Sequence, residues 1–440
     1  MKDLNNVIKA DPSIERLATV TKRLFLFSLW YHPSHFGMHV DDMATAFSRA
    51  GYDVTIVTVN RAAFDNSYFD AFRHMFDVTT TKWQRIFRLN VESLVERGSL
   101  NPIVKIVRDQ VFDACMQEIR LSNCHLIHFF EFFLADFNAE IVSTSITSSL
   151  IYAGNFVTRI LADNHGELTE MITIEKIVFG MLAPYSLDCS DGSYRLRGVD
   201  CILSETRELP EMLRATKLRT PAHWISRPIS CESVLKAPPY DIHRGFGIPE
   251  NAKVLLYAGR PSKNARVLPK VLGLVRRDYA KAEPVILLLI GARDDDIVDW
   301  DQLCEQRAHI RAVPFVGRDM LFGIMKTVDV FTYPGLLDGY PKVVSEASLA
   351  GAPIVAFSSV TSGLNEMVEN ERSALVINVA SPDRSTDLEV EHFAAAIHRI
   401  LTDSELRDRL TQRAFDAAME MDTKQVVARI ERQWEQYRRS

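Results

Sequence analysis

The sequence alternates short apolar runs with longer amphipathic stretches, and it does so in two successive series, which begin near residues 23 and 253. A continuous apolar run is typical of a strand covered on both faces, and strands separated by helical stretches form parallel sheets. Two such series predict an α/β protein with two Rossmann-like, doubly wound parallel-sheet domains. The expected strands are RLFLFSLW, DVTIVTV, CHLIHFF, RILADN and VDCILSE in the first series, and KVLLYAG, PVILLLIG, IRAVPFVG, DVFTYP, APIVAFS and ALVINV in the second.

Residues 231–250 separate the two series, because they lose strand and helix periodicity and contain Pro238 and Pro239. The last apolar-periodic stretch has no strand after it. We therefore expect an N-terminal arm (1–20), an N-terminal domain (21–230), a linker (231–250), a C-terminal domain (251–421) and a terminal helix (422–440).

Composition excludes several classes of protein. The chain has 440 residues and a formal net charge of −6, so overall basicity gives no reason to expect nucleic-acid binding. Its six cysteines form no C-x-x-C pair, which favours a reducing cytoplasm over a disulfide scaffold or a zinc site. The longest apolar run, 285–292, is far shorter than the about 20 residues of a spanning helix.

One segment, residues 82–108, is locally basic, with six lysines and arginines against two glutamates. Two interpretations remain open: a solvated helix face, or a surface that binds an anionic acceptor or the inner face of a membrane.

Polar residues with binding chemistry follow the expected strands of the second series, where open parallel sheets bind their ligands. Arg260 and Lys263 lie in a tight loop after KVLLYAG, and two cations there would suit a diphosphate. Taken alone, two cations in such a loop are more often solvated surface residues than a binding site.

The stretch DGYPKVVSEASLAGAPIVA follows DVFTYP and opens a helix. Asp338 precedes that helix and Glu346 lies about two turns within it, so the two carboxylates can contact different parts of one long ligand. Gly339 permits close approach of backbone to a ligand. A nucleotide sugar needs two acceptor sites and a cationic clamp, although Asp338 as an N-cap and Glu346 as a solvated residue remain open alternatives.

Two residues of the first series also follow expected strands. Gly37 begins the helix after RLFLFSLW, and His165 precedes a glycine after RILADN. A strand-end histidine is more often structural than catalytic, and the neighbouring glycine favours a role in the site. The acidic run GARDDD is interpreted as a solvated loop, so we expect no metal site.

These motifs together resemble retaining glycosyltransferases of family 4, which have the GT-B fold. The Gly-Arg plus Lys loop appears as AGRPSKN, and the acidic-Gly-aromatic-Pro turn with its second Glu appears as DGYPKVVSE. The resemblance spans most of residues 22–440 and is weakest over 61–120. It differs in the Asp at 338, the three-residue step from Arg260 to Lys263, and the single Gly37.

The resemblance implies two domains facing a central cleft, a terminal helix packed back on the N-terminal domain, and a role for each matched residue. Glu346 would hold the ribose of the donor, while Arg260 and Lys263 would neutralise the diphosphate. The remaining matched residues would surround the sugar and its phosphates: Asp338, the amides of Gly339 and Tyr340 in the turn that Pro341 completes, His165 near the anomeric carbon, and Gly37 on the phosphate side.

The expected activity is therefore metal-independent transfer of a sugar, with retention, from a nucleotide-diphosphate sugar to an unidentified acceptor, without a cofactor. The alternatives are an impaired GT-B scaffold that only binds partners, and a GT-B epimerase or phosphorylase. The chain holds no convincing pyridoxal phosphate lysine site for a phosphorylase, and no G-x-G-x-x-G motif follows the first strand as a dinucleotide-dependent oxidoreductase would require.

Overall fold

The structure is a computed structural model, and it describes the strands of the N-terminal half together with most of the C-terminal half. The described residues are 23–27, 35–59, 86–89, 126–129, 147–152, 187–190, 193–196, 201–204, 207, 210, 211, 214, 219–261, 263–279, 283–300, 303–336, 340–359, 362–381 and 384–437.

The first sheet forms the N-terminal domain and is parallel, with the order β3-β2-β1-β4-β5-β8-β9 among the described residues. Helix α1 (His35–Arg49) connects β1 to β2. A separate antiparallel hairpin, β6 (Leu187–Ser190) with β7 (Ser193–Leu196), precedes β8. The strands of the sheet are β1 (Arg23–Phe27), β2 (Asp53–Val59), β3 (Ile86–Leu89), β4 (Leu126–Phe129), β5 (Thr147–Tyr152), β8 (Cys201–Ser204) and β9 (Ala222–Trp224).

Four of the five strands expected in this domain are present. The fifth, RILADN, lies outside the described residues. Strands β3, β5 and β9 were not expected from the sequence, because they are short or, like TSSLIY in β5, partly polar rather than continuously apolar.

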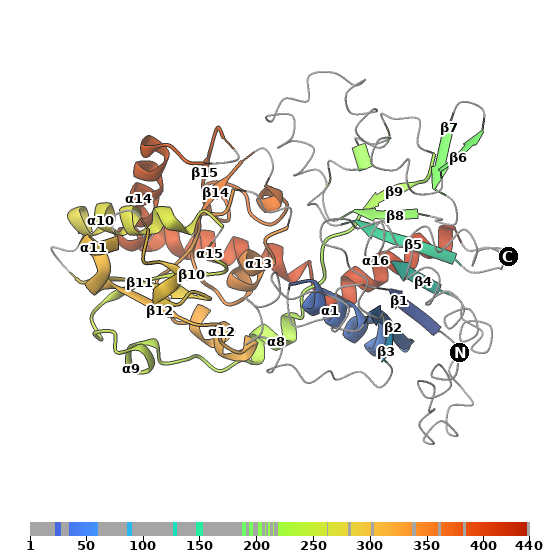
Figure 1. Ribbon diagram of the computed structural model, residues 1–440, viewed down its shortest axis with the longest axis horizontal. Helices are drawn as coiled ribbons and strands as arrows, with labels where there is room; N and C mark the ends of the chain where they lie inside the picture. Colours follow the sequence, from blue (N-terminus) through green and yellow to red (C-terminus); the bar gives the residue numbers. More distant parts are fainter. Residues whose placement is uncertain are drawn as a thin grey trace.

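The second sheet forms the C-terminal domain and is also parallel, with the order β12-β11-β10-β13-β14-β15. All six strands expected there are confirmed, and the two domains lie beside one another in Figure 1. The strands are β10 (Lys253–Ala258), β11 (Val285–Ile290), β12 (Ile310–Val313), β13 (Val330–Tyr333), β14 (Ile354–Ser358) and β15 (Leu375–Asn378), and the helices that follow them include α10 (Leu268–Tyr279), α11 (Leu303–Gln306), α12 (Arg318–Met325), α13 (Lys342–Leu349), α14 (Asp387–Thr402) and α15 (Ser404–Met419).

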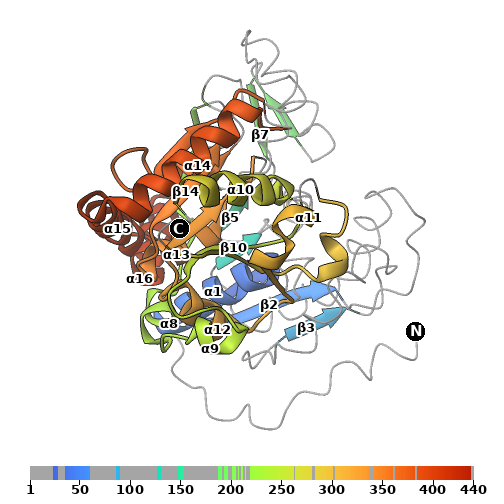
Figure 2. The same cartoon turned by 90° about the vertical axis from the view of Figure 1, so that its left-hand side faces the viewer.

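Helices cover both faces of this sheet, which explains why its strands are apolar at successive positions. Along β10, Val254 and Leu256 pack into one core with α12, α13 and α15, whereas Leu255 and Tyr257 pack into the other with α10 and α14. Figure 2 views the domain from its end, with α10 and α14 on one side of the sheet and α12 and α13 on the other.

The segment 231–250, expected as a linker, contains α8 (Cys231–Lys236) and α9 (Ile242–Phe246). Val234 and Ile242 are buried in the α12–α13 core, so this segment packs as part of the C-terminal domain. Proline and glycine around these short helices obscured their periodicity in the sequence. In the described part of the chain, no helix has the length and apolar character needed to cross a bilayer.

Helix α16 (Thr423–Gln436) leaves the C-terminal domain and packs on α1 of the N-terminal domain (Figure 1). The ring of Trp434 stacks on Phe47 with centroids 5.2 Å apart, and Tyr52 Oη donates to Glu431 at 2.7 Å. The chain therefore crosses between domains twice. The crossings lie side by side, because Ile229 N donates to Met421 O at 3.0 Å and Thr423 N donates to Ile229 O at 3.1 Å.

Candidate active site

The strand order places one ligand-binding position at the carboxyl ends of β10 and β13. The chain proceeds from β10 to β11 and β12 in one direction, and then returns to β13 on the other side of β10. Loops diverge at such a switch point, and open α/β sheets bind ligands in the crevice between them. Residues 259–264 follow β10 and residues 334–346 follow β13. The loop after β10 and the start of the segment after β13 therefore lie side by side at this edge of the sheet.

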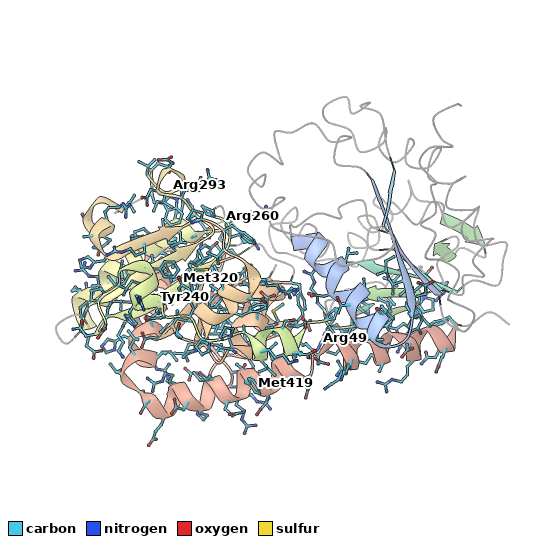
Figure 3. All side chains as sticks on the ribbon, turned by 90° about the horizontal axis from the view of Figure 1, so that it is seen from below. Arg49, Tyr240, Arg260, Arg293, Met320 and Met419 are labelled. Atoms are coloured by element: carbon cyan, nitrogen blue, oxygen red, sulfur yellow. The ribbon has the colours of Figure 1, made fainter. Side chains whose placement is uncertain are left out.

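The loop after β10 is a tight turn that hydrogen bonds to the Arg260 carbonyl stabilise. Lys263 N donates to Arg260 O at 3.1 Å, and Tyr257 Oη donates to the same carbonyl at 2.6 Å. Asn264 Nδ2 donates to Pro334 O at 3.1 Å, which ties this loop to the end of β13. The Arg260 side chain is exposed and lies on the side of the C-terminal domain that faces the N-terminal domain (Figure 3).

The segment after β13 is anchored where it leaves the strand, because Ser359 Oγ donates to Leu336 O at 2.6 Å. Asp338 and Gly339, two of the expected donor-binding residues, lie outside the described residues, as does His165. Pro341 occupies the N-cap position of α13, so the alternative of Asp338 as the N-cap of this helix is wrong. The predicted roles of Asp338, Gly339 and His165 toward the sugar stay predictions.

The side chain of Tyr340 belongs to the core. It is 2% exposed, its Oη lies 3.3 Å from Met421 Sδ, and the Arg227 guanidinium lies 5.1 Å from its ring centroid. These contacts fix the turn that leads into α13. Any contribution of Tyr340 to ligand binding would therefore come through its backbone, as the resemblance implies.

Glu346 lies on α13 and is buried, with 8% of the residue exposed. Its Oε1 accepts from Arg318 Nη2 at 3.3 Å and lies 3.8 Å from Lys342 Nζ. Arg318 is the first residue of α12, and Lys342 is the first residue of α13. The interpretation of Glu346 as a solvated helix residue is therefore wrong.

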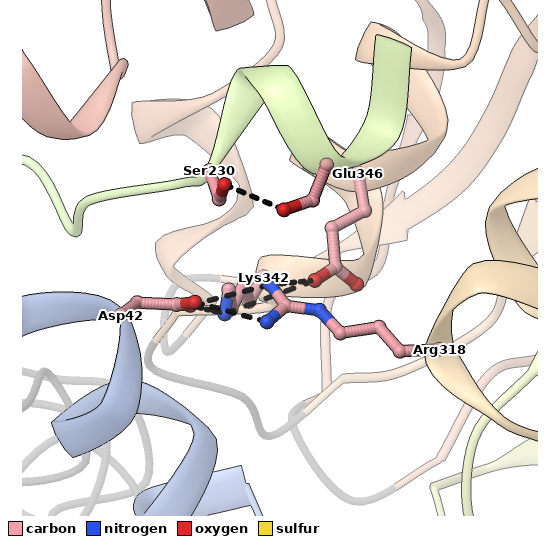
Figure 4. Close-up of polar contacts among 6 residues, drawn as sticks. Asp42, Ser230, Arg318, Lys342 and Glu346 are labelled. Carbon is pink, nitrogen blue, oxygen red and sulfur yellow. Dashed lines mark hydrogen bonds and ion pairs between the residues drawn. The ribbon is translucent and has the colours of Figure 1, made fainter. Parts of the chain in front are cut away.

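A fourth side chain reaches this group from the other domain. Asp42 of α1 receives Arg318 Nη1 at 2.9 Å and Nη2 at 3.3 Å, and it also accepts from Lys342 Nζ (Figure 4). Asp42 is 5% exposed and Lys342 is 3% exposed. We call Asp42, Arg318, Lys342 and Glu346 the interdomain ion network. Its two cations and two carboxylates balance in charge.

The ionisation of this network follows from burial and pairing. Burial would raise the pKa of Asp42, but the adjacent Lys342 and Arg318 outweigh it and hold that pKa below its usual value. Burial would lower the pKa of Arg318, but Asp42 and Glu346 raise it. Burial and the Arg318 charge lower the pKa of Lys342, whereas the two carboxylates oppose them. An ammonium in contact with Asp42 and close to Glu346 has the surroundings of a charged lysine.

Gly37 lies in the first turn of α1, directly after β1 along the chain. Strands β1 and β4 are neighbours at the switch point of the first sheet, so this turn stands at the corresponding position of the N-terminal domain. The side chain of Asp42 extends from the same helix into the interdomain ion network.

The acidic run 294–296 has local structural partners. Arg293 N donates to Asp296 Oδ2 at 2.7 Å, and Asp294 pairs with Arg307 Nη2 at 2.7 Å. Across the part of the chain that the structure describes, no three His, Cys, Asp or Glu residues cluster in a way that would hold a metal ion.

The sequence reasoning missed Asp42, Arg318 and Lys342. Two of them carried a readable signal: Arg318 follows β12 after a glycine, and Lys342 precedes Glu346 by one helical turn. Asp42 carried none, because its partners lie in the other domain.

Comparison with known proteins agrees with this geometry. Residues 241–417 match the family described as Glycosyl transferases group 1. An uncharacterised glycosyltransferase of Methanocaldococcus jannaschii is 27% identical over 184 residues, which cover 40% of this chain and 42% of the relative. The D-inositol 3-phosphate glycosyltransferase of Nocardioides sp. is 25% identical over 189 residues, covering 39% of each protein. The chain thus matches about two fifths of the length of these curated relatives.

Solved structures match nearly the whole chain. The sucrose-phosphate synthase of Thermosynechococcus elongatus has a TM-score of 0.66 at 15% identity and covers 94% of this chain and 98% of its own. HepE of Anabaena, solved with UDP and glucose, has a TM-score of 0.61 at 12% identity and covers 94% of this chain and 100% of its own. The protein therefore has the GT-B fold, and its residues 241–417 match the model of the glycosyl transferases group 1.

Proposed function

We propose that this protein transfers a sugar from a nucleotide-diphosphate sugar to an acceptor, with retention at the anomeric carbon and without a metal ion or cofactor. The observation that supports the proposal is the switch point between β10 and β13, where the loop that contains Arg260 and Lys263 is hydrogen-bonded to the end of β13 through Asn264 and Pro334. The match to the group 1 family over 241–417 and the UDP bound by the related HepE structure support this donor class.

Each half of the donor would meet a different part of this crevice. Arg260 and Lys263 would bind the diphosphate and stabilise the charge that develops on it as the sugar leaves. Glu346 would accept hydrogen bonds from the ribose hydroxyls. Asp338 and the amides of Gly339 and Tyr340 would hold the transferred sugar, with His165 near the anomeric carbon and Gly37 on the phosphate side.

Retention would proceed by attack on the face that the leaving group departs from. No carboxylate in the motifs is placed as a nucleophile, so the departing phosphate itself would take the acceptor proton. The bond from the anomeric carbon to the diphosphate oxygen breaks as the bond to the acceptor oxygen forms. Detection of a covalent glycosyl-enzyme would overturn this step.

The overall proposal is tested by incubating the protein with a panel of UDP-, GDP- and ADP-sugars and measuring release of the nucleoside diphosphate. A transferase should release the diphosphate from one donor, slowly by hydrolysis and faster with its acceptor. No release from any donor, with the protein folded, would favour the alternative of an impaired GT-B scaffold.

Replacement of Arg260 by alanine should weaken the binding of the nucleoside diphosphate itself, by about tenfold to a hundredfold, because a charged hydrogen bond is lost. Arg244→Ala is the control, since Arg244 is also an exposed arginine of this domain but belongs to α9, which packs with α12 and α13. Calorimetric titration with UDP, GDP and ADP measures both variants. Equal affinities in wild type and Arg260→Ala would remove Arg260 from the site.

The basic segment 82–108 supports a second, peripheral part of the proposal: the protein would be cytoplasmic and would contact an anionic surface through this segment. Of that segment only β3 lies within the described residues. Co-sedimentation with vesicles containing anionic lipid should be strong at low salt and fall steeply toward about 0.5 M salt, where screening is nearly complete over a few ångströms. Vesicles of neutral lipid serve as the control. No co-sedimentation at low salt would support the solvated-face interpretation instead.

A further inference from the structure

The interdomain ion network contains more positive charge in the C-terminal domain than that domain can balance. Arg318 and Lys342 belong to α12 and α13, and Glu346 is the carboxylate of this domain that contacts them. Both cations begin a helix, where the helix dipole disfavours positive charge. The second carboxylate is Asp42, which the N-terminal domain contributes. Complete charge balance therefore requires the two domains to be together.

The two oxygens of Glu346 have different surroundings. Oε1 accepts from Arg318 and lies near Lys342, whereas no described residue forms a hydrogen bond or ion pair with Oε2. The cations thus fix one oxygen and leave the other without a hydrogen-bond partner among the described residues. A carboxylate that is fixed through one oxygen suits a pair of ribose hydroxyls, because the lone pairs of its second oxygen can accept hydrogen bonds from a ligand.

Asp42 determines how strongly the cations act on Glu346. It receives both guanidinium nitrogens of Arg318 and the ammonium of Lys342. Without this carboxylate, Lys342 and Arg318 would have Glu346 as their remaining anion in the network. Lys342 Nζ already lies 3.8 Å from Oε1, so the Glu346 carboxylate would then turn to serve two cations with two oxygens.

We propose that Asp42 is a positioning residue that couples the approach of the two domains to the availability of Glu346 for the donor ribose. Asp42 acts through Lys342 and Arg318 and does not touch the donor. The inference rests on the proposed function, since it takes Glu346 as the ribose acceptor. It predicts that Asp42, although part of the other domain, controls how well the site distinguishes a ribose from a sugar without 2′ and 3′ hydroxyls.

The test compares the affinity of the protein for UDP, GDP and ADP with its affinity for their 2′,3′-dideoxy counterparts by calorimetric titration. Wild type should prefer the ribose form of the nucleotide that binds. Asp42→Asn keeps the size of the side chain but removes its charge, and it should lower that preference by about tenfold while leaving the dideoxy affinity nearly unchanged. A purely structural defect would instead weaken both forms alike.

Three further variants sharpen the test. Asp42→Glu restores the charge and should recover most of the ribose preference. Glu232→Gln is the matched control, because Glu232 of α8 also pairs with α1, through Arg49 at 2.8 Å, but that pair is exposed and lies outside the network. Its ribose preference should equal that of wild type. Should Asp42→Asn fail to fold, the charge-balanced double variant Asp42→Asn with Lys342→Gln is measured instead. It leaves Arg318 as the single cation of the network on Glu346, so the ribose preference should stay near that of wild type, and a loss there would show that Asp42 does not act through the two cations.

The outcomes separate this inference from the proposed function. A wild-type preference for ribose that persists in Asp42→Asn would overturn the inference and leave the proposed function standing. A loss of preference in Glu232→Gln as large as in Asp42→Asn would also overturn it, because the effect would then belong to the domain contact in general. A wild-type protein that binds no nucleoside diphosphate would overturn the proposed function itself, and the inference with it.

Discussion

Replacement of Lys342 by methionine should lower the free energy of unfolding of the C-terminal domain by about 3–5 kcal/mol, because removal of one partner leaves buried charge uncompensated. Lys342 is 3% exposed and lies between Asp42 and Glu346. Methionine retains most of the side-chain volume, so the loss of free energy of unfolding would come from the missing charge rather than from a cavity. Urea unfolding, fitted to the transition of this domain, provides the measurement.

Two matched variants identify the cause of that loss. Lys236→Met removes a lysine whose pair with Glu232 is exposed to solvent, and it should change stability by about 0.5 kcal/mol or less. Adding Asp42→Leu to Lys342→Met restores the charge balance, and replacing a buried pair by apolar side chains is often close to neutral. A Lys342→Met protein within about 1 kcal/mol of wild type would contradict the buried-charge account.

Acid should act on the same network with a definite sign. Because the pKa of Asp42 is lowered in the folded protein, its stabilising contribution is complete above the unfolded value of about 3.9 and is lost as pH falls through the lower folded value. In Lys342→Met one of the cations that lowers this pKa is absent. Stability should therefore fall less steeply from pH 5 to pH 2 in the variant than in wild type.

The second large effect concerns the two acidic residues of the DGYPKVVSE motif, which should act on different halves of the donor. Glu346→Gln should raise the donor KM by about tenfold to a hundredfold with little change in kcat, because it weakens ribose binding equally in the ground and transition states. Asp338→Asn should instead lower kcat, because the geometry of the sugar changes in the transition state. Initial rates over a range of donor concentrations separate KM from kcat.

A further substitution, Asp338→Glu, tests the length of this side chain. Asp338 is one methylene shorter than the glutamate typical of the family that the sequence resembles. If the shorter acid fits a particular sugar, Asp338→Glu should reduce activity with the native donor. Full activity of Asp338→Asn would contradict the role of Asp338 in the sugar site. Circular dichroism confirms that each variant is folded before its kinetics are compared.

The fold was readable from the sequence where strands are buried on both faces. The six strands of the C-terminal domain are nearly continuous apolar runs, such as VILLLI in β11, and each is followed by a turn signal. Strand β5 escaped prediction because half of TSSLIY is polar. A continuous apolar run in the sequence predicts a strand buried on both faces well. A strand that mixes polar and apolar side chains without regular alternation gives no such signal.

The candidate site was readable only in part, for a related reason. The carboxyl-end rule for parallel strands led to Arg260 and to the motif that contains Glu346, and the structure shows that the strands before them, β10 and β13, are neighbours. The contact between Asp42 and Arg318 joins residues 276 positions apart. No periodicity or spacing within one element encodes such a pair, because it depends on how two separately folded sheets are placed against each other.

Helix α16 also bears on how the protein is made. The core of the N-terminal domain combines Leu24, Met43 and Phe47 from the start of the chain with Ile430 and Trp434 from α16. At a synthesis rate of about 5–20 residues per second, α1 would wait on the order of tens of seconds for the helix that covers it. During translation the apolar face of α1 would stay exposed to chaperones, and the domain encoded first would be the last to complete its core.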